Sequence, residues 1–102
     1  MITAVFSRSG GRYVGFEISG HSGLSGAGSD VLCAAVSAAT ELAANLIGGE
    51  TAVDGKTAKV TVRIPSPDEN SERVTSAFHR QLKGYSSEYP RNIRIVEQEC
   101  VL

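Results

Sequence analysis

The chain has 102 residues, in which ten Lys and Arg side chains nearly balance eleven Asp and Glu side chains. This length supports one modest hydrophobic core, so we expect a single domain over residues 1–102. Because the net charge is only −1, general attraction to nucleic acid or to acidic membranes is excluded, and no direct nucleic-acid binding is expected.

Neither the start of the chain nor its longest apolar stretch predicts export or membrane insertion. Residues 1–6 lack a basic region ahead of a long apolar run, and they have the pattern of a strand. The stretch 31–47 contains four polar residues and is too short to span a bilayer. The two cysteines, Cys33 and Cys100, form neither a disulfide framework nor a Cys-x-x-Cys pair. We therefore expect a cytoplasmic protein with a free thiol at Cys33.

The first third of the chain predicts a hairpin followed by a soft loop. Residues 2–7 and 12–18 flank a glycine pair, and the second segment alternates apolar with polar or small residues, which indicates two paired strands. Residues 19–29 then hold four glycines and four serines. That composition does not hold one backbone shape without help, so we expect a mobile loop.

A helix is predicted over residues 31–47, with Asp30 as its N-cap and a glycine pair at 48–49 as its stop. Its alanines allow close approach to a sheet. Its few polar residues share one narrow stripe, which holds Cys33, Ser37, Thr40 and Glu41. Cys33 is therefore expected to face a cleft.

The rest of the chain predicts a strand, a helix and a strand. Residues 57–64 alternate as a third strand, and residues 71–89 are amphipathic, with His79 on the polar surface and Gly84 able to bend the last part. Residues 91–100 follow as the last strand. The order strand-strand-helix-strand-helix-strand predicts an α+β fold, a small mixed sheet with two helices packed mainly on one face.

The chemistry suggested by the sequence rests on His21 and Cys33. A cysteine in the first turn of a helix meets unpaired amides and a partial positive charge, which favour the thiolate. His21 follows a glycine directly after a strand, so a sharp turn can bring its ring over the helix start as general base and then general acid. Backbone N–H groups of Cys33 and its loop neighbours can form an oxyanion hole, and the loop can act as a lid.

Simpler interpretations stay open at this point. A lone cysteine in an alanine-rich helix is most often an inert packing residue, and the spacing of His21 equally allows an exposed loop histidine. Two histidines and two scattered cysteines show no short metal-ligand spacing, so no metal is expected. The glycines lack a phosphate-binding or dinucleotide pattern, so no cofactor is expected either.

The segment Ser19-Gly20-His21, followed by Gly28, Asp30 and Cys33-Ala34-Ala35-Val36-Ser37, resembles the ribosomal-processing cysteine protease family, Prp. The resemblance implies a cytoplasmic bacterial endopeptidase that acts as a homodimer. It implies as substrate the N-terminal extension of the large-subunit ribosomal protein number twenty-seven. The roles that it implies are nucleophile for Cys33, base for His21, supporting positions for Asp30 and Ser37, and flap hinges for Gly20 and Gly28.

Three functional hypotheses follow from these residues. The main one is peptide-bond hydrolysis through an acyl-thioester on Cys33. The alternative is a non-catalytic, ribosome-associated peptide-binding module in which Cys33 is packed and is alkylated slowly. The third is a redox sensor, which requires the sulfurs of Cys33 and Cys100 to come within bonding reach.

Overall fold

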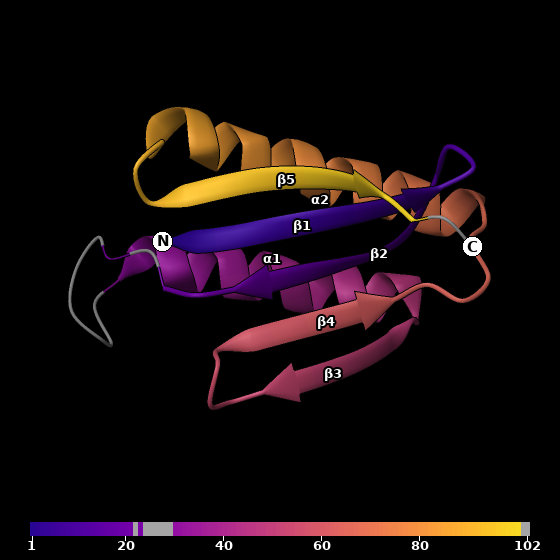
Figure 1. The fold of residues 1–102 in the computed structure, drawn as a ribbon, viewed down its shortest axis with the longest axis horizontal. Coiled ribbons are helices and arrows are strands. Elements are labelled where there is room, and N and C mark those ends of the chain that lie inside the picture. The colour runs from indigo at the N-terminus through magenta and orange to yellow at the C-terminus, as the bar shows by residue number, and fades with distance from the viewer. Residues whose placement is uncertain (22, 24–29, 101–102) are drawn as a thin grey trace.

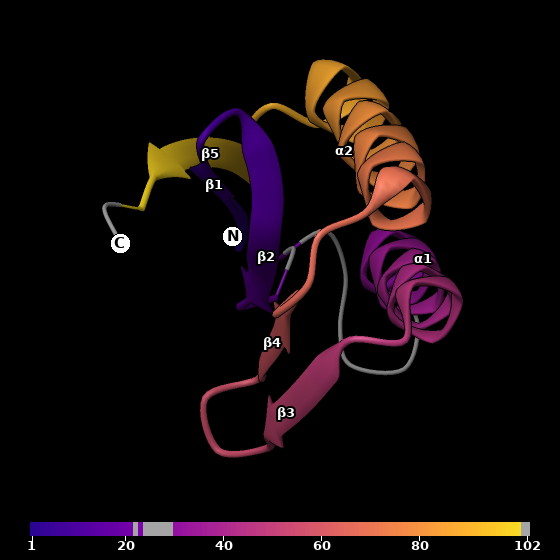
Figure 2. The ribbon, with the colours of Figure 1, turned by 90° about the vertical axis from the view of Figure 1, so that its right-hand side faces the viewer.

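The structure, a computed structural model, describes residues 1–21, 23 and 30–100. Its elements in chain order are β1 (Ile2–Ser9), β2 (Arg12–Ser19), α1 (Val31–Ile47), β3 (Glu50–Asp54), β4 (Lys59–Arg63), α2 (Glu69–Glu88) and β5 (Ile93–Glu99). The five strands form one sheet in the order β3-β4-β2-β1-β5, in which only β1 and β5 pair in parallel (Figure 1). Both helices lie on one face of this sheet (Figure 2). The predicted α+β fold class is confirmed.

The structure adds the strand β3, which the sequence prediction lacks. All five residues of β3 are exposed, so the segment has no buried alternation that could mark it as a strand. Pairing with β4 holds it in place, with Val53 opposite Val60 and Asp54 opposite Lys59. β3 is therefore an edge strand that owes its conformation to its neighbour, and this dependence is invisible to sequence periodicity.

Aromatic rings fill the space between the sheet and α2. Phe6 in β1 is fully buried, and its ring lies 5.8 Å from that of Phe16 and 5.7 Å from that of Phe78, measured between centroids. α2 begins two residues before the predicted start, because Asp68 caps it, and it continues through Gly84 to Glu88. No helix in the described ranges is long and apolar enough to cross a membrane.

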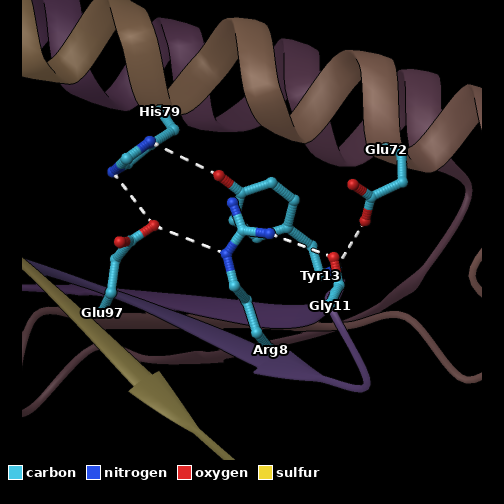
Figure 3. Close-up of polar contacts among 6 residues, drawn as sticks. All are labelled: Arg8, Gly11, Tyr13, Glu72, His79 and Glu97. Atoms are coloured by element: carbon cyan, nitrogen blue, oxygen red, sulfur yellow. Dashed lines mark hydrogen bonds and ion pairs between the residues drawn. The ribbon is translucent and has the colours of Figure 1, made fainter.

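The sequence predicts His79 on the surface of α2, but the structure partly buries it. Its side chain is 15% exposed, with Nδ1 3.4 Å from the Tyr13 hydroxyl and Nε2 3.7 Å from a carboxylate oxygen of Glu97 (Figure 3). Burial lowers the pKa of His79, while Glu97 raises it and Lys83 and Arg8 lower it further. The polar partners come from β2 and β5, so the spacing within α2 alone could not reveal them.

Candidate active site

Gly20 shapes the turn by which the chain leaves β2. Its φ of +86° is a conformation that L side chains rarely adopt, and a Cβ at this position would collide with the carbonyl oxygen of Met1. Its N–H donates a hydrogen bond to the carbonyl of Ala58 at 3.2 Å. These contacts fix the backbone immediately before His21, which is exposed at the end of the turn.

Asp30 caps α1, as predicted, and so positions Cys33. The extended backbone of Asp30 lets its Oδ1 accept the Cys33 N–H at 3.0 Å, while its own carbonyl accepts the Ala34 N–H at 3.1 Å. The Cys33 N–H is therefore bound to Asp30, which corrects the expectation that it serves as an oxyanion donor. Among the described residues, the N–H groups of Val31 and Leu32 have no acceptor.

A groove of about 630 Å³ brings the candidate catalytic residues together. It lies between α1 and the strands β2, β3 and β4, and its lining includes Gly20, His21, Cys33 and Ser37. Its volume is in the range that small-ligand and peptide side-chain sites occupy. Asp30 contacts the site through the Cys33 backbone and is not part of the lining. Gly28 and nearly all of the predicted loop lid lie outside the described residues.

The polar stripe of α1 forms one wall of the groove. Cys33 is partly buried, Ser37 and Glu41 are exposed, and all three line the groove as their shared stripe predicts. Thr40 also lies there, but its buried hydroxyl donates to the Val36 carbonyl at 2.7 Å and is held by the helix itself.

Some of the lining was missed by the sequence interpretation. Asn45 continues the stripe of α1, and Thr51 and Val53 of β3 line the opposite side. The spacing of Asn45, four residues after Glu41, was a signal that could have found it. The contribution of β3 had no such signal, because the strand itself was not predicted.

The two cysteines lie at opposite ends of β1. Ile2, at the start of this strand, lines the groove with Cys33, whereas the Cys100 N–H donates to the carbonyl of Arg8 at 2.7 Å near the other end. Ile2 and Arg8 are separated by about 20 Å of strand. Both cysteines are free thiols. Because a disulfide needs Cα atoms within about 7 Å, the redox-sensor hypothesis is wrong for this fold.

The described part of the chain contains no cluster of side chains that could bind a metal ion. No group of three or more His, Cys, Asp or Glu residues is gathered there in a way that could hold an ion. The groove itself offers a thiol at a helix start, an imidazole on a constrained turn, and apolar surface beside them.

Comparison with known proteins gives one family and several similar folds. The profile of a family described as cysteine protease Prp matches residues 1–94. The ribosomal processing protease Prp from Staphylococcus aureus, solved with a covalently linked product peptide, has a TM-score of 0.88 and 21% identity, covering 96% of this chain and 100% of that one. The same protease with a substrate peptide has a TM-score of 0.79 and 19% identity, at the same coverage.

A protein from Streptococcus mutans has the same fold, with a TM-score of 0.84 and 21% identity, covering 98% of this chain and 99% of that one. At such identities the likeness to these structures establishes the fold alone. Among curated protein sequences, no match is found.

Proposed function

The chain belongs to the Prp family of cysteine proteases, and from that premise we propose that Cys33 and His21 form its catalytic dyad. The observation that carries the proposal is that both residues line one groove, with Cys33 in the first turn of α1 and His21 directly after the Gly20 turn. The positive end of a helix stabilises negative charge that develops beside it, and an imidazole in the same groove can supply the base.

In the proposed reaction, His21 takes the proton of the Cys33 thiol, and the thiolate attacks the carbonyl carbon of the scissile peptide bond. The C–N bond breaks as the imidazolium returns the proton to the leaving amine. Water, deprotonated by His21, then hydrolyses the acyl-thioester and frees Cys33. The amides of Val31 and Leu32 at the start of α1 stabilise the developing oxyanion, which replaces the role first given to the Cys33 amide.

The supporting residues act on the helix and on the peptide. Asp30 holds the backbone of Cys33 through its cap, and so fixes where the sulfur leaves the helix. Ser37 lies one turn beyond Cys33 on the same wall of the groove, where its exposed hydroxyl can bind the substrate backbone. Gly20, held at the end of β2, is the proposed fixed end of a flap, and Gly28, outside the described residues, is its second proposed hinge.

The proposed substrate is the N-terminal extension of the large-subunit ribosomal protein number twenty-seven in a bacterial cytoplasm. Two facts support it: the family to which the chain belongs, and the description of a Staphylococcus aureus protein of the same fold as a ribosomal processing protease. The groove has apolar surface from β3 and β4 beside the polar wall of α1, which suits an extended peptide.

The test is cleavage of that extended ribosomal protein, with the product masses read by mass spectrometry. Cys33→Ala and His21→Ala are expected to abolish cleavage while circular dichroism shows an intact fold. Cys100→Ala is the matched control, because it removes a thiol at the far end of β1 and is expected to cleave normally. Full activity of either dyad variant would refute the dyad, and peptide binding without any cleavage by the unaltered protein would favour a binding module.

We further propose that residues 1–102 act as one protease domain that works as a homodimer. A small domain gains stability by covering a sheet edge, and β3 is an edge strand whose residues are all exposed. Sedimentation equilibrium is expected to give twice the mass of the chain, and a single-chain mass at working concentration would contradict the dimer.

A further inference from the structure

The groove continues along α1 beyond the proposed nucleophile. Cys33, Ser37, Glu41 and Asn45 follow one another at intervals of four residues, and all four line it. Such spacing places them on one side of the helix, one turn after another. Opposite them lie Thr51 and Val53 of β3 and Val60 of β4. An extended peptide that lay along this groove with its scissile bond at Cys33 would therefore run between a polar wall and an apolar strip.

Glu41 is the carboxylate of this groove that has no partner among the described residues. Asp54 also lines it, but its Oδ1 accepts the backbone N–H of Lys56 at 2.9 Å in the turn after β3. The hydrogen bond from the Lys56 N–H is the main reason that the pKa of Asp54 is lowered. The one Lys in the lining, Lys59, pairs with Glu17 at 3.3 Å. Glu41 forms no ion pair or hydrogen bond of this kind with residues 1–21, 23 or 30–100.

The end of α1 extends the negative potential of this wall of the groove beyond Glu41. The last turn of a helix carries a partial negative charge from its unpaired carbonyl groups, and α1 has no basic residue in its last turn. Glu41 lies between Cys33 and that end. Both features favour a positively charged side chain of a bound peptide.

The distance along the helix gives the position of that side chain. Eight residues separate Cys33 from Glu41, which is about 12 Å of helix. An extended peptide covers about 12 Å in three to four residues. We propose that Glu41 is a specificity-determining residue that selects peptides carrying Lys or Arg three or four residues from the scissile bond, on the side that lies along α1. This inference rests on the proposed function, because it takes Cys33 as the point of cleavage.

The test measures kcat/KM for peptides that carry Lys, norleucine or Glu at the third or fourth residue on each side of the cleaved bond. The unaltered protein is expected to prefer Lys over norleucine by about two- to fivefold on one side, as an exposed ion pair allows. Glu41→Gln is expected to lose this preference through KM, and Glu41→Lys to reverse it in favour of Glu. The preference is expected to shrink as ionic strength rises.

Glu88→Gln is the matched control, because it removes the same charge from the end of α2, outside the groove lining. It is expected to keep the preference for Lys. A preference that survives in Glu41→Gln, or that never exists on either side, would overturn the role of Glu41 while leaving Cys33-dependent cleavage intact.

Binding separates this inference from a failure of the proposed function. The Kd of the same peptides for Cys33→Ala, measured by fluorescence anisotropy, reads the selection without any cleavage. A Lys preference that Glu41→Gln removes supports the role of Glu41 even if no variant cleaves the peptide. Equal Kd values for Lys and norleucine peptides would contradict it.

Discussion

A single backbone position, Gly20, links the fold to the proposed chemistry. It is the residue at which the chain leaves β2 with positive φ against the Met1 carbonyl, and His21 follows directly. The Cys33 side of the dyad is fixed separately by the Asp30 cap. The geometry of the dyad therefore depends on two local backbone devices at the same end of the molecule.

Gly20→Ala tests the first of these devices. The left-handed backbone alone is expected to lower the free energy of unfolding by about 1–3 kcal/mol, and the contact with Met1 adds to this. Cleavage is expected to fall more than the folded fraction does, because His21 is displaced. Urea unfolding and peptide cleavage measure the two effects.

Gly84→Ala is the matched control for that substitution. Gly84 lies inside α2, nothing would touch its added Cβ within 4 Å, and its φ is not in the left-handed region. Alanine there is expected to raise the free energy of unfolding by about 0.5–1 kcal/mol with unchanged cleavage. Equal stabilities for Gly20→Ala and the unaltered protein would disprove the importance of the turn.

At the scale of the elements, sequence patterns predicted the parts that local chemistry determines. The start of α1 followed from Asp30, whose side chain needs only the amide three residues on, and its end followed from Gly48. α2 begins two residues before the predicted start at 71, because Asp68 and its capping partner Ser71 close the first turn there. Both helix starts therefore depend on local signals, an Asp side chain that accepts the backbone N–H three residues on.

What the sequence did not predict depends on contacts between distant segments. β3 exists through pairing with β4, and His79 is held by Tyr13 and Glu97 from other elements. At the candidate site, the polar stripe of α1 predicted one wall of the groove, whereas Val53 on the other side came from the unpredicted strand. Contacts of this kind between distant segments do not produce a periodic pattern of apolar residues in the sequence of either segment.

The cap of α2 gives a prediction at this scale. The Asp68 carboxylate accepts the Ser71 N–H at 2.8 Å, and the Ser71 hydroxyl accepts the Asp68 N–H at 2.9 Å. Asp68→Ala is expected to lower the free energy of unfolding by about 0.5–2 kcal/mol, measured by urea titration. Asp68→Asn keeps an accepting oxygen and is expected to retain most of the stabilisation that the cap provides. An Asp68→Ala protein as stable as the unaltered one would show that the cap contributes nothing.

At the scale of the whole molecule, the candidate site and the His79 cluster occupy separate regions. The groove lies beneath α1 at the start of β1, and the cluster of Arg8, Tyr13, His79 and Glu97 joins α2 to the sheet near the end of β1 (Figure 3). Changes in the cluster are therefore expected to act on stability and to leave the cleavage chemistry unchanged.

The pH dependence of stability tests the cluster. Because burial lowers the pKa of His79 in the folded protein, the unfolded chain binds this proton more readily. The contribution of His79 to the free energy of unfolding is expected to be complete above the ordinary histidine pKa of about 6.5 and to be lost as the pH falls below it. Urea midpoints across this range measure the slope.

His79→Gln is expected to lose that slope, whatever its stability at neutral pH. His21→Gln, at the other histidine, is the matched control and is expected to keep the slope. Parallel pH curves for His79→Gln and the unaltered protein would show that His79 does not cause the loss of stability.

The most direct test of the account is the mass of the enzyme during turnover. Rapid acid quenching of the protein with its peptide substrate, followed by intact-mass and digest analysis, reads the covalent intermediate. The account predicts a mass increase equal to that of the N-terminal fragment less one water, located on Cys33 and absent from Cys33→Ala. An acyl group on another residue, or cleavage that continues in Cys33→Ala, would contradict it.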